Sequence, residues 1–271
     1  MGAARGEPVS AAARRLGTTL LSLVLSLGLV AAGWTLFLKI LNVNPLVAKS
    51  PADVWTYLAA GSEAGAHRST VWSGLWVTLR DAGAGLVAGL VAAAAVAVAF
   101  VLWRTAERSF MPIAMVVRSV PLVAMTPVIT LIFGRDLLAT TVISGIVVFF
   151  PALVNVVFGL RSASAQAADL VRAYGGSSWT TMRKVLVPSA LPAFFASARI
   201  SVPGSLIGAL LAEWLATGKG LGYAMLTAGS SFRYDELWAS VVAVTLASLA
   251  AYGLVGVAEA AVLARYAPRD R

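Results

Sequence analysis

The sequence predicts an all-α, polytopic membrane protein with about six transmembrane helices. Of its 271 residues, 59% are hydrophobic and 12% are charged, whereas a soluble domain averages about 45–50% and about 25%. The apolar residues lie in long runs, and a bilayer core of about 30 Å is crossed by about 20 helical residues. The chain has no cysteine, which excludes disulfides and cysteine-ligated metals.

Six apolar runs are the expected spans. They are Thr18–Leu41, Trp72–Trp103, Phe110–Phe133, Leu137–Leu160, Leu191–Ala216 and Leu237–Leu263. The domain plan is therefore a tail at 1–17, a transmembrane domain at 18–264 and a tail at 265–271. The first run could imitate a signal peptide, but it exceeds the roughly 7–15 apolar residues of a signal core, which favours a retained helix.

Two of the six runs have features that a single straight membrane-crossing helix would not have. The second is too long for one straight crossing, so its Arg80-Asp81 pair predicts that the crossing begins near Asp81, with Trp72–Leu79 on the membrane surface. Its Gly85 and Gly89 have GxxxG spacing, which permits close helix packing against the same subunit or against another. The third run contains three prolines, which predict a broken helix; they are Pro112, Pro121 and Pro127.

The loops divide the basic residues unequally. The net charge of +9 suggests nucleic acid at first sight, but twelve Lys and Arg fall on one side of the six-span plan and six on the other. The richer side holds both tails, a short basic turn at Arg104–Ser109 and the loop 161–190, which we call the central loop. Because loops rich in Lys and Arg stay in the cytoplasm, both termini and the central loop are expected there.

The central loop has its own predicted structure. Apolar residues recur at i, i+3, i+4 and i+7 over Ser164–Tyr174, which indicates one face of a short helix; they are Ala167, Leu170, Val171 and Tyr174. Asp169 and Arg172 occupy the other face. Gly175 or Gly176 can adopt a positive φ and stop this helix.

A second short helix is expected next. Ser177 is a suitable N-cap for a helix over Ser178–Val187, which Pro188 would end. The central loop is thus predicted to be a helix, a glycine turn and a helix along the cytoplasmic surface. On the other side, SPADVWTYL indicates a short capped helix with Ser50 or Asp53 near its N-terminus.

Catalytic and metal motifs are missing from the sequence. The nearest approach to a phosphate loop is Gly218-Lys219-Gly220, but Glu213 and Gly220 stand where GxxxxGK[ST] needs Gly and Ser or Thr. His67 is the only histidine and is expected to be a surface loop residue. The chain is therefore predicted to bind no metal and to catalyse no reaction.

Ionisable residues inside the spans are functional candidates. Arg118 and Arg199 lie at similar depth from the cytoplasmic side. Each has either a structural role, in which it snorkels or bonds to backbone carbonyls freed by nearby prolines, or a functional one. In the functional role it draws an anionic substrate or closes an inner gate. Glu213, near the outer end of its span, is either an outer-gate residue or structural.

Uncharged polar residues add further candidates. Asn155 either lines a pathway or makes an interhelical hydrogen bond, and the second is favoured. Ser201 and Ser205 follow Ser197 at four-residue spacing, so the three hydroxyls share a face. That face suits close packing or a wetted pathway.

The central loop also resembles a known motif. DLVRAYGGS followed by VLVP is similar to the EAA loop, EAA-x3-G-x9-I-x-L-P, of inner-membrane permeases of ATP-binding-cassette importers. Asp169 takes the Glu position, Gly175 the Gly and Pro188 the Pro, whereas Leu-Val replaces Ala-Ala and two valines replace Ile and Leu. Further similarity lies in RSVPLVAMTPVITLIFG, VFFPALVNVVFGL, LPAFFASARI and AEWLATGKGLGY. Together they resemble the branch that imports nitrate, aliphatic sulfonates and taurine, and in some members thiamine-precursor pyrimidines or riboflavin.

The resemblance implies a type I importer permease in the inner (plasma) membrane of a prokaryote. Such a permease works as a homodimer with two ATPase subunits, which bind ATP and Mg, and with an extracytoplasmic binding protein; this chain itself would hold no cofactor. The residues implied to couple to the ATPase are Asp169, Leu170, Val171, Arg172, Ala173, Tyr174, Gly175, Gly176, Ser177 and Pro188. Binding-protein contacts are expected at Asn42–Val71 and Thr217–Leu237.

Three readings of function remain. The expected one is an importer permease for a small anion, with an uncharged heterocycle such as a pyrimidine as the alternative substrate. A stand-alone secondary transporter is the second reading, although no internal repeat is evident. A membrane-anchored structural protein is the third.

Overall fold

The computed structural model describes residues 7–265, and all regular structure in this range is helical. Its elements are α1 (Glu7–Ile40), α2 (Pro51–Ala59), α3 (Ala64–Leu102), α4 (Arg104–Ser119), α5 (Leu122–Phe133), α6 (Leu137–Arg161), α7 (Ala165–Ala173), α8 (Ser178–Thr181), the π-helical turn η1 (Met182–Leu186), α9 (Val187–Ala212), the π-helical turn η2 (Glu213–Thr217), α10 (Gly220–Ser230) and α11 (Tyr234–Leu263). Helix α1 includes 7–17, which the sequence plan assigned to a tail. Residues 1–6 and 266–271 of the expected tails lie outside the described range.

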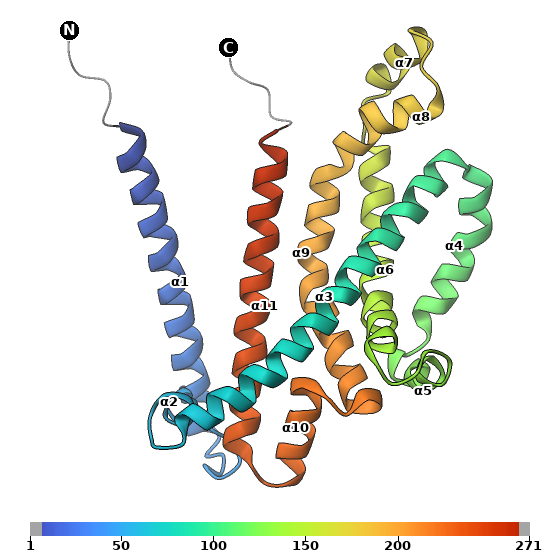
Figure 1. The fold of residues 1–271 in the computed structure, drawn as a ribbon. Helices are drawn as coiled ribbons and strands as arrows, with labels where there is room; N and C mark the ends of the chain where they lie inside the picture. Colours follow the sequence, from blue (N-terminus) through green and yellow to red (C-terminus); the bar gives the residue numbers. More distant parts are fainter. Residues whose placement is uncertain (1–6, 266–271) are drawn as a thin grey trace, which may run out of the picture.

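The long helices run between two ends of the molecule (Figure 1). The start of α1, the end of α11 and the pair α7–α8 lie at one end, which we call the loop end. Helices α2, α5 and α10 lie at the opposite end, and α3 crosses the bundle at a steep incline. This division agrees with the grouping of loops used for the charge count.

Four helical segments of the described chain are long and apolar enough to cross a membrane. They are Ala64–Leu102, Leu137–Arg161, Ser178–Thr217 and Tyr234–Leu263, and they match the second, fourth, fifth and sixth expected spans. The bent pair α4–α5 would make a fifth. The first expected span coincides with α1, whose described apolar stretch, Val24–Ile40, is shorter than a full crossing.

Helix α3 continues through the position near Asp81 where the sequence predicted the crossing to begin. Helix α3 is continuous over 39 residues, about 58 Å at 1.5 Å per residue, and Trp72–Leu79 forms part of it. The incline of α3 in Figure 1 accommodates this length without a break. The Arg80 guanidinium binds the Asp81 carboxylate through Nε (2.8 Å) and Nη2 (2.7 Å), so the two charges compensate each other and the helix need not end there.

The third run is broken, as its prolines predicted. Helices α4 and α5 meet at an angle of 104°, and the break falls at Val120-Pro121. Pro112 and Pro127 are accommodated inside helices. The basic turn expected at Arg104–Ser109 is wrong, because these residues form the beginning of α4.

Close backbone contacts join α3, α6 and α9. A Cβ atom on Gly85 would lie 2.3 Å from the Ser144 side chain, and one on Gly89 would lie 2.7 Å from the carbonyl oxygen of Gly145. A Cβ on Gly208 of α9 would lie 2.7 Å from Cα of Ser144. The GxxxG pair of α3 therefore packs within the subunit, which decides between the two partners that its spacing allowed.

Pro188 does not end a helix, contrary to the sequence expectation. The segment Ser178–Thr217 is one helical rod of 40 residues. Within it, the Val187 N–H donates to the carbonyl of Met182, an i→i−5 bond that makes η1 a π turn. Pro188 comes directly after this widened turn, at the first turn of α9, where a residue without an N–H is tolerated.

Candidate functional site

The glycine turn of the central loop has the predicted form. The Gly175 N–H donates to the Arg172 carbonyl and the Gly176 N–H to the Val171 carbonyl, both at 2.9 Å, which is the Schellman pattern. Gly175 has a φ of 78°. A Cβ on Gly176 would lie 2.5 Å from Cγ1 of Val171, so one glycine provides the conformation and the other provides space.

Serine caps begin both helices of the loop. The Ser164 hydroxyl oxygen accepts from the Ala167 N–H at the start of α7, and that of Ser177 accepts from the Thr180 N–H (3.2 Å) at the start of α8. Each cap satisfies one of the free N–H groups of a helix N-terminus. Ser177 thus has the capping position that the sequence predicted.

The apolar face of α7 is largely open in the single chain. Leu170 is 59% exposed and Tyr174 is 87% exposed, whereas Ala168 is the residue that this helix buries. Trp179, which the sequence analysis did not select, adds a third exposed apolar side chain (60%) from α8. We call Leu170, Tyr174 and Trp179 the loop patch. A tryptophan in an otherwise polar loop was the signal that could have identified it.

The charged residues of α7 stay in solvent. Arg172 and Asp169 form an exposed pair at 3.2 Å on the helix surface, and Ala173 is also exposed. An exposed pair of this kind contributes about 0–1 kcal/mol. Both charges therefore remain available to a partner.

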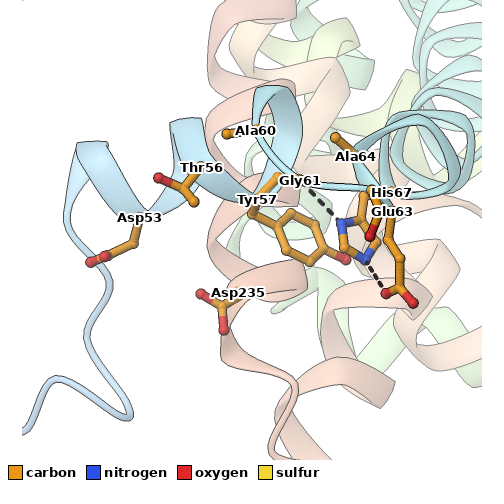
Figure 2. Close-up of a pocket in the computed structure, with 10 residues that line it drawn as sticks. Asp53, Thr56, Tyr57, Ala60, Gly61, Glu63, Ala64, His67 and Asp235 are labelled. Carbon is orange, nitrogen blue, oxygen red and sulfur yellow. Dashed lines mark hydrogen bonds and ion pairs between the residues drawn. The ribbon is translucent and has the colours of Figure 1, made fainter.

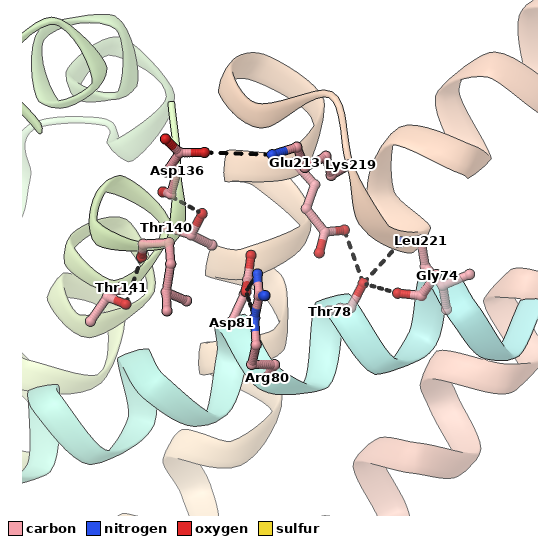
Figure 3. Close-up of polar contacts among 11 residues, drawn as sticks. Gly74, Thr78, Arg80, Asp81, Asp136, Thr140, Thr141, Glu213, Lys219 and Leu221 are labelled. Carbon is pink, nitrogen blue, oxygen red and sulfur yellow. Dashed lines mark hydrogen bonds and ion pairs between the residues drawn. The ribbon is translucent and has the colours of Figure 1, made fainter. Parts of the chain in front are cut away.

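At the opposite end, Glu213 is completely buried. Its Oε2 atom accepts hydrogen bonds from the Thr78 hydroxyl (3.0 Å) and the Gly222 N–H (2.6 Å), and the Thr78 hydroxyl accepts from the Leu221 N–H (2.9 Å). Figure 3 shows how Thr78 of α3 links Glu213 to Leu221. Because Leu221 and Gly222 lie in the first turn of α10, the carboxylate sits where the helix dipole favours negative charge.

Glycines make room for this carboxylate. Gly220 has a φ of 79°, and a Cβ there would lie 2.2 Å from Oε1 of Glu213. A Cβ on Gly222 would lie 2.7 Å from the Leu210 carbonyl oxygen. The turn that lacks the residues of a phosphate loop therefore surrounds a carboxyl group of the same chain. Of the two sequence readings of Glu213, the contacts favour the structural one.

The serine face of α9 is buried in the bundle. The Ser144 hydroxyl of α6 donates to the Ser205 carbonyl (2.7 Å), and the hydroxyls of Ser197 and Ser205 donate to carbonyls of their own helix (2.8 Å each). Ser201 is 4% exposed, and its hydroxyl has no partner within the described residues. In this chain the face serves close packing, the first of its two expected roles.

Arg199 forms an ion pair that the sequence analysis missed. Its Nη2 atom lies 2.8 Å from Oε2 of Glu259 on α11, and its guanidinium lies 5.8 Å from the ring centroid of Tyr252. This arrangement replaces the expected bonds to backbone carbonyls. A single acid in the last apolar run was the available signal, because a buried arginine requires a partner of opposite charge.

The remaining pathway candidates are less constrained. Arg118 is exposed in the last turn of α4 and forms no ion pair within residues 7–265. Asn155 is half-buried on α6, and its side chain makes no hydrogen bond within the same range. The interhelical hydrogen bond favoured for Asn155 is therefore not formed inside the described chain.

A cavity of about 400 Å³ lies between α2, the start of α3 and the start of α11 (Figure 2). The His67 ring stacks on Tyr57 with ring centroids 3.9 Å apart, and its Nδ1 lies 3.0 Å from the Tyr57 carbonyl oxygen. His67 thus belongs to a helix and packs, contrary to the expected loop position. Burial, followed by the nearby Glu236 carboxylate, raises the pKa of Tyr57. Asp53 and Asp235 also line this cavity.

Comparison with known proteins decides the family. Residues 85–267 match the binding-protein-dependent transport system inner membrane component. The chain belongs to this family. A probable ABC transporter permease protein of Haemophilus influenzae is 30% identical over 69% of this chain and 76% of its own length. The chain is therefore a transport permease and not an enzyme.

Other relatives differ in the solute they are named for. The formylaminopyrimidine transport permease protein ThiX of Halalkalibacterium halodurans is 34% identical over 43% of this chain and 47% of its own. The taurine transport system permease protein TauC of Escherichia coli is 24% identical over 82% of each. Further matches are named for riboflavin, aliphatic sulfonates and nitrate.

A solved structure supports the fold. An amino acid ABC transporter crystallised with histidines aligns with a TM-score of 0.52 at 18% identity, over 72% of this chain and 95% of the other. The helical bundle thus has the fold of that transporter chain, and at this identity the likeness concerns the fold alone.

Proposed function

We propose that this permease conducts a small anion, such as nitrate, a sulfonate or taurine, delivered by an extracytoplasmic binding protein and driven by separate ATPase subunits. The alternative is the same machinery acting on a pyrimidine or flavin-like heterocycle. The names of the relatives include both kinds of solute. We further propose that two copies of the chain form the pathway, and that both termini are cytoplasmic.

The loop patch carries the coupling proposal. Leu170, Tyr174 and Trp179 are exposed apolar side chains on a loop whose two helices are fixed by serine caps and a Schellman turn. Exposed apolar side chains gathered in this way mark partner surfaces. The ATPase is the partner we infer, and it would hold the ATP and Mg.

A continuous helix connects this surface to the opposite end. The rod Ser178–Thr217 measures about 60 Å at 1.5 Å per residue. It begins at the loop patch, and Glu213 lies in its last turn. Movement of the loop would therefore tilt the whole rod as a rigid body, since packed helices shift as units. The buried bonds of Glu213 to Thr78 and Gly222 would pass that tilt to α3 and α10.

The test uses the complete transporter in proteoliposomes. We expect Leu170→Asp with Tyr174→Ala to reduce ATP-dependent uptake at least about tenfold, because about 1.4 kcal/mol of lost docking energy corresponds to that factor. Trp103→Ala is the control, since Trp103 is an exposed aromatic (64%) at the end of α3 and outside the loop. Uptake that persists without the ATPase would overturn the proposal in favour of a secondary transporter.

A further inference from the structure

A small cavity at the opposite end gathers positive charge from three distant parts of the sequence. It measures about 170 Å³ and is lined by Arg80 of α3, Arg135 of the α5–α6 turn and Lys219 of the turn before α10, together with Asp81, Asp136, Leu137 and Thr217. Figure 3 shows that Arg80, Asp136 and Lys219 belong to three different segments that approach one another. We call this cavity the cation pocket.

The two carboxylates do not cancel the three cations. Asp81 is buried, and its Oδ1 atom is bound by both Nε and Nη2 of Arg80. Asp136 faces Lys219 at 3.5 Å, with both side chains mostly exposed, so this pair is weak. Arg135 forms no ion pair within residues 7–265. The five groups sum to a formal charge of +1.

Uncharged donors also lie at the pocket. The hydroxyl oxygen of Thr217 is buried without a hydrogen-bond partner in the described chain. Helix α6 begins at Leu137, and no side chain caps its first turn. Free N–H groups at a helix N-terminus favour an anion. The pocket thus combines net positive charge with a helix N-terminus.

The volume limits what can bind. At about 30 Å³ per water molecule in the liquid, the cavity of about 170 Å³ has room for an anion of a few heavy atoms. Sites for ligands of drug size measure about 300–1,000 Å³, and this cavity is smaller. Of the two arginines that the sequence suggested for an anion, Arg199 is already paired with Glu259, and Arg118 does not line this pocket.

We propose that the cation pocket is a binding site for a small oxyanion, a sulfonate or nitrate, on its way into the permease. This inference rests on the proposed function and assigns the anion to residues that neither the sequence motifs nor the family match identifies. Arg135 and Lys219 are its binding groups. Arg80 neutralises Asp81, which would otherwise repel the anion.

The experiment uses the absence of native cysteine. Leu137→Cys places one thiol in the pocket lining, and Leu46→Cys places a matched thiol at an exposed loop residue (72%) outside it. The purified permease in nanodiscs is treated with an anionic methanethiosulfonate reagent, which itself carries a sulfonate, and with a cationic one. The ratio of the two modification rates reports the local preference for an anion.

We expect the anionic-to-cationic ratio at Leu137→Cys to exceed that at Leu46→Cys by about tenfold, the factor that about 1.4 kcal/mol represents. Added methanesulfonate should slow modification at Leu137→Cys only. Arg135→Gln with Lys219→Gln should remove both effects, and Arg135→Lys with Lys219→Arg should retain them. Equal ratios at the two thiols, or equal protection by an uncharged pyrimidine, would overturn the proposal.

Two further outcomes separate this site from its alternatives. If a lipid phosphate fills the pocket, methanesulfonate will not protect and modification will be faster in detergent than in nanodiscs, which overturns the soluble-anion assignment. The rates are measured without ATPase or transport. A failure of ATP-dependent uptake in the complete transporter therefore counts against the proposed function, whereas a failure of anion preference counts against the pocket.

Discussion

The two glycine turns at the ends of the long helical rod have opposite surroundings. The turn at Gly175-Gly176 leaves the apolar side chains of α7 exposed, whereas the turn at Gly218–Gly222 closes around the buried carboxylate of Glu213. One rod, Ser178–Thr217, joins the two. The difference indicates that one end is built to bind a partner and the other to hold its own helices together.

The closed turn should be the more sensitive to added volume. Gly222→Ala places a Cβ 2.7 Å from the Leu210 carbonyl oxygen, and overpacking of this kind costs about 1–3 kcal/mol. Gly65→Ala in α3 is the control, because nothing lies within 4 Å of its Cβ and alanine favours a helix. Unfolding free energy in mixed micelles is the measurement. Equal unfolding free energies for the two variants would show that the turn at Gly218–Gly222 is not especially sensitive to added volume.

The open turn should respond in coupling more than in stability. Gly175→Ala forces a residue with a Cβ into a φ of 78°, at a cost of about 1–2 kcal/mol. Since the loop patch depends on the angle between α7 and α8, we expect ATPase stimulation by the loaded binding protein to fall severalfold while the bundle stays folded. Gly61→Ala, also at a positive φ (108°) but far along the chain from the loop, should leave stimulation unchanged.

The ion pair between Arg199 of α9 and Glu259 of α11 tests whether contact with α11 stabilises the rod between its two ends. Arg199→Gln alone leaves Glu259 without its partner, and truncating one member of a buried pair costs up to about 3–5 kcal/mol, less here because Arg199 is one-third exposed. Restoring neutrality with Glu259→Gln should recover part of the loss. A double-mutant cycle of unfolding free energies measures the coupling. Strict additivity would show that the pair contributes nothing.

The smallest expected effect concerns the capping box of α2. Hydrogen bonds from the Ser50 N–H and hydroxyl lower the pKa of Asp53. A lowered folded-state pKa means that the stabilisation is present above the unfolded pKa of about 3.9 and is lost as the pH falls through the folded value. The difference in melting temperature between the protein and Asp53→Asn should therefore shrink below about pH 4. A constant difference would exclude the linkage.

Local patterns in the sequence predicted much of the loop end. The i, i+3, i+4 spacing before Gly175 and the Ser177 cap depend on neighbouring residues, and both are found where expected. The prediction that Pro188 ends a helix was wrong because the π turn that precedes the proline lets the helix continue. Helix α3 also continues from Trp72–Leu79 through Arg80 and Asp81, whose charges neutralise each other within the helix.

The sequence by itself determined that this chain is helical, that it belongs in a membrane, and that its polar central loop is a capped helix pair. These properties follow from composition, periodicity and short-range backbone chemistry, which neighbouring residues supply. Only the tertiary structure decided that Glu213 caps α10, that Arg199 pairs with Glu259, and that Arg80, Arg135 and Lys219 share a pocket. Each of these depends on how helices pack against one another, which no local pattern encodes, and a buried group such as Glu213 requires the partners that this packing supplies.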